Sequence, residues 1–398
     1  MHDRLAARED GMWGSNMIKL PLGIQIFRTI IEGGYIYADK TNYVYSLING
    51  AKYNFLSRPR RFGKSLLLDT IAETFGGDKE LFKSLYIYYT DYNFAKHPVL
   101  RLDMSNISND DPKTLKESLI NELRTIIKNE DLKTISNIAS DMFKELIKHI
   151  FEKYGKTVVV LIDEYDKPIL DHIDDIEVAE ANRKVLKGFY GILKSMDPYL
   201  RFTFITGVTK YTKTSIFSEL NNLFDITLAK DYANICGITK EDLNKYFVDY
   251  IAGIAKLNNQ KYIEIYDNIL TWYDGYSWDG VTSVINPFSL LSFFTQKRFS
   301  NFWYASGTPA FLTKLIKEKP SAFLSLDNLK ISERALDTFD ITKMSAVPLL
   351  FQTGYLTISE LIYHGFSINY LLRMPNYEVK EAFNINIIAE LNGFPKSQ

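Results

Sequence analysis

Two short segments of the chain carry side chains that could bind phosphate and a metal ion. The first is Gly63-Lys64-Ser65, which follows an expected strand at residues 53–56 and precedes a helix beginning with Leu66. Phosphate oxygens need backbone N–H donors at close range, a helix N-terminus and a cation. Gly63 lets the backbone approach, Lys64 can reach the β and γ phosphates, and the Ser65 hydroxyl can ligate magnesium.

The loop before this triplet departs from the usual phosphate-binding motif. Arg58 occupies the position of the leading glycine, and Pro59 removes one N–H donor. We call residues 58–65 the P-loop. Its arginines at 58, 60 and 61 form a dense basic cluster. These side chains could meet phosphate, an acidic partner surface, the ATP of a neighbouring subunit as an arginine finger, or solvent.

The second segment is Asp163-Glu164, which ends the continuous β-branched and aliphatic run 158–162. Such a run is typical of a strand buried on both faces of a parallel sheet, and ligands bind at the carboxyl edge of such sheets. Asp163 can hold magnesium, usually through water, and Glu164 can take a proton from an attacking water. An exposed loop with two acids is the alternative. Finding both segments in this order on these elements favours a nucleotide site.

A third segment, Thr206-Gly207-Val208-Thr209-Lys210, follows the expected strand 202–206. If that strand lies beside the P-loop strand, its end faces the γ-phosphate. Thr206 or Thr209 could then orient water, and Lys210 could neutralise developing charge. A polar exit from the strand is the competing interpretation.

The expected strands alternate with amphipathic helices, which predicts a doubly wound, mainly parallel α/β sheet of the P-loop NTPase type. We expect a disordered tail at 1–16, a P-loop ATPase core at 17–233, a helical lid at 234–310 and a helical, winged-helix-like region at 311–398. The last region carries two expected strands, 354–358 and 366–371. The core strands are expected at 53–56, 99–104, 158–162, 202–206 and 225–228.

Composition narrows the class of protein. The chain has 398 residues, and its 47 Lys and Arg nearly balance its 48 Asp and Glu, which argues against a dominant nucleic-acid-binding face. The single cysteine, Cys236, cannot form an internal disulfide or a thiolate zinc site. No apolar stretch approaches the ~18 residues of a membrane span, and the N-terminus lacks a signal-peptide pattern. We therefore expect a cytoplasmic protein without a membrane partner.

Two further patterns favour structural roles. The aromatic segment from Trp272 to Trp278 indicates a packed turn rather than a base-stacking platform. Glu378-Val379-Lys380 has the Glu-x-Lys spacing of a metal nuclease, but no partner aspartate on a preceding strand accompanies it. We expect Glu378 to begin a helix.

The chain resembles the AAA-ATPase-like family of bacterial and archaeal proteins, which often carry a C-terminal nuclease-like domain of the PD-(D/E)XK type. The resemblance runs from about Leu20 almost to the end, and the P-loop block Arg-Pro-Arg-Arg-Phe-Gly-Lys-Ser is distinctive. The other matching blocks are residues 20–23, 37–41, 161–168, 206–210, 215–218, 221–223 and 354–356.

This resemblance implies a P-loop fold with an additional strand between the strands that bear the two Walker motifs. It also implies that Arg58 is typical of the family. Lys64 and Ser65 carry over as phosphate and magnesium residues, Asp163 as the magnesium acid and Glu164 as the catalytic acid. Because the chain stops at Gln398, we expect the nuclease module to be missing or truncated and carry over no nuclease activity.

We therefore expect an ATPase that uses ATP and Mg²⁺ to drive or switch a conformational change. Glu164 and Lys64 are the catalytic candidates, and Ser65 and Asp163 are the metal ligands. The alternative is a nucleotide-gated DNA- or protein-binding module with little hydrolysis; a small-molecule kinase ranks last, because Glu164 favours water as acceptor. The oligomeric state stays open. Nucleotide contacts are expected from Arg60, Arg61, Phe62, Gly63, Lys64, Ser65, Leu66, Thr206 and Thr209.

Overall fold

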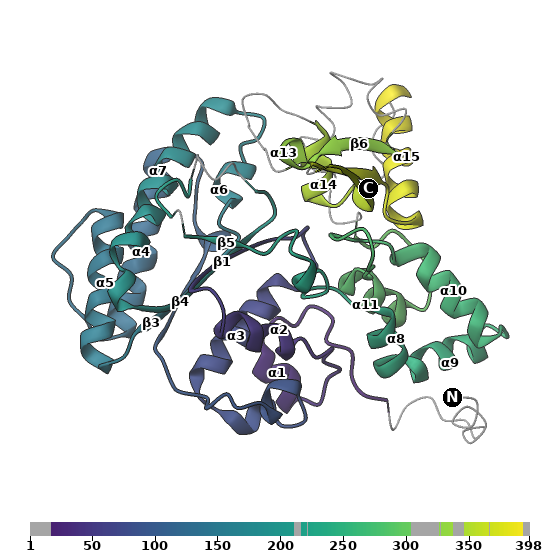
Figure 1. Cartoon of the computed structure of the whole chain (residues 1–398), viewed down its shortest axis with the longest axis horizontal. Helices are drawn as coiled ribbons and strands as arrows, with labels where there is room; N and C mark the ends of the chain where they lie inside the picture. Colours follow the sequence, from purple (N-terminus) through teal and green to yellow (C-terminus); the bar gives the residue numbers. More distant parts are fainter. Residues whose placement is uncertain are drawn as a thin grey trace.

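A parallel five-stranded sheet forms the centre of the described part of the chain (Figure 1). The computed structural model describes residues 17–210, 216–220, 222–303, 326, 328–336, 346–365 and 367–392. The strand order is β2-β3-β4-β1-β5, and all neighbouring strands run parallel, which confirms the predicted α/β class. The strands are β1 (Tyr53–Ser57), β2 (Val99–Asp103), β3 (Val158–Asp163), β4 (Leu200–Gly207) and β5 (Phe224–Asp225).

The order of the strands places β4 between β1, which enters the P-loop, and β3, which ends in Asp163. This is the additional strand that the family resemblance implies. Every residue of β3 is buried, as the aliphatic run predicts for a strand covered on both faces. Parallel strands end at the same edge of the sheet, so the carboxyl ends of β1, β3 and β4 lie together.

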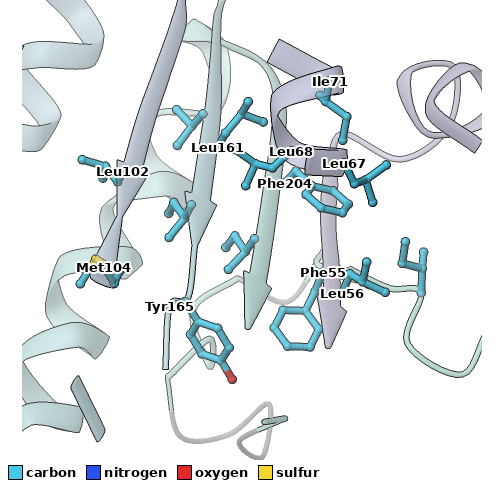
Figure 2. Close-up of a cluster of buried hydrophobic side chains, with 14 of the residues drawn as sticks. Phe55, Leu56, Leu67, Leu68, Ile71, Leu102, Met104, Leu161, Tyr165 and Phe204 are labelled. Carbon is cyan, nitrogen blue, oxygen red and sulfur yellow. The ribbon is translucent and has the colours of Figure 1, made fainter. Parts of the chain in front are cut away.

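Helices cover both faces of the sheet (Figure 1). On one face, Leu67, Leu68 and Ile71 of the helix after the P-loop pack beside Leu161 and Phe204 of the sheet (Figure 2). Within the described ranges, no helix combines the length and apolar character that a membrane span requires. The helices of one face are α1 (Phe27–Glu32), α2 (Thr41–Ile48) and α3 (Lys64–Gly76); those of the other are α4 (Pro112–Asn129), α5 (Ala139–Tyr154) and α7 (Ile176–Ser195), with α6 (Lys167–Leu170) between β3 and α7.

The P-loop helix α3 is held in place by glycines at both ends and by a buried acid in its middle. Gly63 (φ 89°) and Gly77 (φ 84°) flank the helix in the left-handed region, where glycine carries no Cβ penalty. The buried Asp69 accepts a hydrogen bond from the backbone N–H of Phe27 at 2.6 Å and pairs with Arg101 of β2. This acid therefore fixes α3 relative to both α1 and the sheet edge.

Short 3-10 helices span Lys79–Phe82, Tyr86–Tyr89, Met104–Asn106, Asp197–Tyr199 and Lys230–Tyr232.

A separate group of helices follows the sheet and packs around its own apolar core. It falls within residues 234–310, where we predicted a helical lid; the role of a lid remains a prediction. Thr239 and Asp242 form the expected capping box at its first helix. The helices are α8 (Lys240–Tyr246), α9 (Val248–Leu257), α10 (Tyr262–Tyr273) and α11 (Pro287–Gln296).

The C-terminal region contains an antiparallel sheet with strand order β6-β8-β7 (Figure 1). Its hairpin β7–β8 corresponds to the two expected strands, although β7 begins at Thr357 and is longer than expected. The winged-helix assignment is not confirmed and stays a prediction, and parts of 311–398 lie outside the described residues. The elements are β6 (Leu329–Ser332), α13 (Glu333–Leu336), α14 (Ala346–Thr353), β7 (Thr357–His364), β8 (Ser367–Arg373) and α15 (Tyr377–Asn392).

The packing of α3 on the sheet gives a stability prediction. Leu161 has 0% exposure, so Leu161→Ala should destabilise the fold by about 2–5 kcal/mol through lost contacts and a residual cavity. Ile135 has 92% exposure, and Ile135→Ala should stay within about 0.5 kcal/mol of wild type. Thermal unfolding of the three proteins checks both values. Equal melting temperatures for wild type and Leu161→Ala would contradict the packing.

Candidate functional site

The P-loop curls around the amine of its own lysine. Lys64 is buried, and its Nζ donates to the carbonyl oxygens of Arg58 at 2.9 Å and Pro59 at 3.0 Å. Arg61 (φ 70°) and Gly63 (φ 89°) both adopt left-handed backbone conformations, which turn the loop sharply into α3. Burial lowers the pKa of Lys64, while the negative charges of nearby acids oppose that shift. The result is a cation enclosed by the loop at the N-terminus of a helix.

The carboxyl end of β3 meets this loop. The Ser65 side chain lies near the Asp163 carboxylate and lowers its pKa, and Lys64 interacts electrostatically with both Asp163 and Glu164. Burial raises the pKa of Asp163 and of Glu164, and the Lys64 charge works against both shifts. The structure therefore brings together Lys64, Ser65, Asp163 and Glu164, which lie about a hundred positions apart in the sequence.

Thr206 lies at the same edge of the sheet. The register pairs Ile162 with Ile205, so the next step places Thr206 level with Asp163, and Leu56 of β1 lies on its other side. Alternation along β4 puts Thr206 on the same face as Phe204, which packs toward α3 (Figure 2). Its hydroxyl is buried and has no hydrogen-bond partner within the described residues. A buried hydroxyl without a partner at this edge fits a site that a bound ligand or water completes.

The side chains of Thr209 and Lys210, which follow Thr206 in the sequence, bind other acids. We predicted Thr209 as an alternative to Thr206, but its hydroxyl donates to Asp166 at 2.5 Å and the residue is fully buried. The Lys210 ammonium forms an ion pair with Asp225 at 2.6 Å, and its role toward phosphate stays a prediction. Both partners lie far from this segment in sequence, and no local pattern signals either contact.

The three P-loop arginines occupy three different environments. Arg58 is fully buried, with its guanidinium 4.0 Å from the ring centroid of Trp278, and it donates to the carbonyl oxygens of Ser57, Thr227 and Tyr232. Burial lowers its pKa to about 10. Arg58 is thus a structural anchor, and of the alternatives we left open neither solvent nor phosphate applies to it.

The remaining arginines flank the loop. Arg61 stacks on Phe288 at 3.8 Å and donates to the carbonyl oxygen of Phe302 at 3.4 Å. Arg60 is exposed, while its carbonyl oxygen accepts from the indole N–H of Trp303 at 3.3 Å. The Arg61 side chain is therefore committed to the C-terminal half of the chain, and only that of Arg60 is directed to solvent.

Phe62 and Leu66 lie on the side of the P-loop away from the acids. The buried Phe62 ring packs edge-on against Tyr276 at 4.7 Å and Trp278 at 5.4 Å. The aromatic segment from Trp272 to Trp278 is thus a packed turn, as predicted, but no local pattern indicated that it packs on the P-loop. Only the backbone of Phe62 remains available to a ligand.

An apolar cavity of ≈ 100 Å³ opens beside Gly63 and Leu66. Its other walls come from residues 36–38, from residues 235–238 and from α11, so it lies between the sheet and the helical group. Cys236 is one of its buried wall residues. Sequence reasoning missed this cavity because its walls come from segments that lie far apart in the sequence.

The sequence comparisons agree with this arrangement. Residues 21–217 match a family model described as predicted AAA-ATPase. A protein from Azotobacter chroococcum mcd 1, described as an uncharacterized protein in the vnfD 5′ region, is 40% identical over 370 residues. That match covers 92% of this chain and 69% of the relative. The chain belongs to the predicted AAA-ATPase family.

Solved structures similar to this AAA-ATPase family member include ORC proteins. A structure of Drosophila ORC bound to poly(dA/dT) DNA and Cdc6 matches at 12% identity and a TM-score of 0.30, over 73% of this chain and 42% of that chain. The ORC2 protein of Aeropyrum pernix matches at 10% identity and a TM-score of 0.24, over 92% and 98%. This chain thus spans less than half of the Drosophila chain.

Glu378 joins the C-terminal helix to the P-loop neighbourhood of this AAA-ATPase family member. As expected, it lies in the first turn of a helix, α15, where it is fully buried. Its carboxylate accepts from the Ser289 hydroxyl at 2.8 Å and from the backbone N–H of Trp303 at 2.9 Å. No group of three or more His, Cys, Asp or Glu side chains that could hold a metal ion occurs within the described ranges. The contacts of Glu378 are structural, because they connect α15 to Ser289 and Trp303.

The buried Glu378 predicts a pH dependence of stability. Burial raises its pKa from 4.5 to about 7, and the hydrogen bonds and Arg61 oppose that shift. Between these values the folded protein binds more protons than the unfolded chain, so this group lowers the free energy of unfolding as pH rises. Glu378→Gln keeps the shape and an acceptor oxygen, and should therefore gain stability over wild type as pH increases from 5 to 7.

Thermal unfolding of both proteins at several pH values within this range measures the difference. A difference between wild type and Glu378→Gln that does not change with pH would contradict the raised pKa. Glu117, exposed on α4, provides the matched Glu→Gln control, and its curve should run parallel to that of wild type.

Proposed function

We propose that this chain binds Mg-ATP on the P-loop and hydrolyses it, and that hydrolysis switches the contacts between the P-loop and the C-terminal half. The observation that carries the proposal is the convergence of Ser65, Lys64, Asp163 and Glu164 at the start of α3, where the Ser65 side chain and the Lys64 charge both act on the Asp163 carboxylate. A hydroxyl, a lysine and two carboxylates around a helix N-terminus form the set of groups that a nucleotide triphosphate and its metal ion require.

The phosphates bind at the start of α3. The backbone N–H groups that follow Gly63 point toward the ligand, and the helix N-terminus favours its negative charge. Lys64 then exchanges its two carbonyl acceptors, on Arg58 and Pro59, for the β and γ phosphate oxygens. This exchange loosens the lysine from the first half of the loop, so ATP binding itself changes the P-loop.

The groups present also fit magnesium. Mg²⁺ prefers oxygen ligands and is usually held by one or two protein groups together with substrate phosphates and water. Ser65 and Asp163 offer two oxygen atoms as ligands, and the Ser65 side chain lies near the Asp163 carboxylate. Magnesium, when bound, supplies positive charge that offsets the charge on the transferring phosphate. Asp163 and Ser65 are the residues that would hold the ion.

Glu164 and Thr206 act on the attacking water. Glu164 accepts a proton as the water oxygen bonds to the γ phosphorus, and the bond from that phosphorus to the bridging oxygen breaks to release ADP and phosphate. Burial raises the pKa of Glu164, and a higher pKa makes its carboxylate a stronger base. The unpaired hydroxyl of Thr206 can orient the same water. Leu66 and the neighbouring apolar cavity receive the base of the nucleotide.

Contacts of the P-loop support coupling to the rest of the chain. Arg60 and Arg61 are bonded to Trp303 and Phe302, and the backbone N–H of Lys210 donates to the Gln352 side chain of α14 at 3.0 Å. These contacts reach both ends of the proposed active site. A change at the γ-phosphate position would therefore alter the contacts that the P-loop and Lys210 make with Phe302, Trp303 and Gln352.

Phosphate release measured with purified variants tests this proposal. Glu164→Gln should keep nucleotide binding but slow turnover by about 100-fold or more, the scale of a lost general base. Lys64→Ala should abolish nucleotide binding. Lys116→Ala, an exposed lysine on α4, is the matched control and should behave as wild type. Phosphate release that is equal in wild type, Lys64→Ala and Glu164→Gln would end the proposal.

The same assay with and without DNA separates the ATPase from a nucleotide-gated binding module. An ATPase releases phosphate with no acceptor added, and Glu164→Gln blocks it. A gated module retains DNA or a protein in an ATP-dependent way while wild type and Glu164→Gln release phosphate equally slowly. The small-molecule kinase requires an added acceptor.

A further inference from the structure

A buried carboxylate ties the loop after β3 to the loop after β4. Asp166 is only 1% exposed, and its side chain accepts hydrogen bonds from the backbone N–H of Val208 at 3.2 Å, from that of Thr209 at 2.6 Å and from the Thr209 hydroxyl at 2.5 Å. Asp166 lies two positions after Glu164, and Val208 lies two positions after Thr206. Glu164 and Thr206 therefore both lie next to this set of hydrogen bonds from Val208 and Thr209 to Asp166, which we call the clamp.

The backbone around Asp166 is held by further bonds between the same two loops. The backbone N–H of Tyr165 donates to the carbonyl oxygen of Thr206 at 3.1 Å. The Tyr165 hydroxyl donates to the carbonyl oxygen of Thr209 at 3.0 Å. The Tyr190 hydroxyl of α7 donates to the carbonyl oxygen of Tyr165 at 3.2 Å. Figure 2 shows the Tyr165 ring directly beyond β3, and it packs edge-on against Phe55 of β1 at 5.4 Å.

Gly207 allows this close approach. A Cβ at this position would lie 2.4 Å from the Asp166 carboxylate and 2.5 Å from the Tyr165 ring, distances that no side chain tolerates. The loop after β4 can thus press directly on the loop after β3. The segment Thr206-Gly207-Val208-Thr209 serves as one wall for Asp166.

Glu164 itself sits in an unusual backbone conformation. Its φ is 49°, in the left-handed region that costs a non-glycine residue roughly 1 kcal/mol or more. Such a conformation persists only where neighbouring contacts impose it. The Glu164 N–H donates to Asp163 at 3.0 Å and its carbonyl oxygen accepts from Lys167 at 2.9 Å, while Asp166 anchors the next turn. The direction of the Glu164 side chain therefore depends on this clamp.

We infer that Asp166 is a positioning residue for hydrolysis: by binding the loop after β4, it sets Glu164 and Thr206 in the relative placement that proton transfer from water requires. The inference rests on the proposed function. Asp166 acts through Glu164 and does not touch the phosphate, since its carboxylate oxygens are occupied by Val208 and Thr209.

The experiment is a double-mutant cycle between Asp166→Asn and Glu164→Gln. Asparagine keeps the volume and one acceptor oxygen, which can still serve Thr209, but it replaces the other oxygen with an NH2 group that faces the Val208 N–H donor. Asp166→Asn should slow phosphate release by about 10- to 100-fold, the scale of a misplaced catalytic group. Its affinity for a fluorescent ADP analogue should stay within about threefold of wild type, because Lys64 and Ser65 are unchanged. In the Glu164→Gln background, Asp166→Asn should cause no further loss.

A merely structural role predicts different results. If Asp166→Asn slows release by the same factor in both backgrounds, or weakens ADP binding as much as it slows release, the inference is overturned. Asp171→Asn provides the matched control, because Asp171 lies directly after α6 and pairs with Lys167 at 2.6 Å. This control should stay within about twofold of wild type.

A second pair of variants keeps the inference testable if Asp166→Asn does not fold. Thr209→Val removes only the hydroxyl donor to Asp166, whereas Thr209→Ser retains it. Slower release in Thr209→Val that Thr209→Ser restores supports the clamp; equal rates overturn it. A wild-type protein without ATPase activity removes the proposed function and this inference together. Normal hydrolysis that depends on Glu164 but not on Asp166 or Thr209 overturns the inference alone.

Discussion

The interaction between the Ser65 side chain and the Asp163 carboxylate is the contact on which the site depends. It joins the first turn of α3 to the end of β3 across the width of β4. The parallel sheet makes it possible, since only parallel strands deliver all their carboxyl ends to one edge. Without this contact the lysine, the acids and the unpaired threonine would belong to unrelated loops. Asp69 supports it from behind by fixing α3 to α1 and β2.

The site concentrates buried charge of both signs. Lys64 is enclosed by carbonyl oxygens, and burial raises the pKa of Asp163 and Glu164 beside it. Buried ionised groups are tolerated only when partners offset the lost hydration. Here the cation and the acids offset one another incompletely, and the hydroxyl of Thr206 has no partner among the described residues. An environment of this kind favours a charged ligand that completes it.

The features predicted from sequence were those encoded by local pattern. The run 158–162 predicted a strand buried on both faces, Gly63 marked the entry to α3, and Thr239 with Asp242 marked the start of α8. These signals depend on neighbouring residues only, so they survive without knowledge of the fold. They sufficed for the fold class and for the pairing of the P-loop with the acids.

The features that sequence reasoning missed all depend on distant partners. Thr209 resembles a second active-site threonine, but its hydroxyl donates a hydrogen bond to Asp166, 43 positions away. Arg58 and Lys210 resemble phosphate-binding cations, and Trp278 and Asp225 lie beside them. Side-chain direction at a loop is set by tertiary contacts, which a motif does not record. Residue type and position therefore identified which segments form the candidate site, and only the structure showed which of their side chains lie in it.

The enclosure of Arg58 gives the two halves of the P-loop different partners. The Arg58 guanidinium lies against Trp278 and is bonded to the chain around Thr227 and Tyr232, so the first residues of the loop are fixed beside β5. The later residues Arg61 and Gly63 carry the left-handed turns that lead into α3, and the Arg61 side chain contacts Phe288 and Phe302. The P-loop is therefore a junction at which the parallel sheet, the helical group and the chain around Phe302 meet.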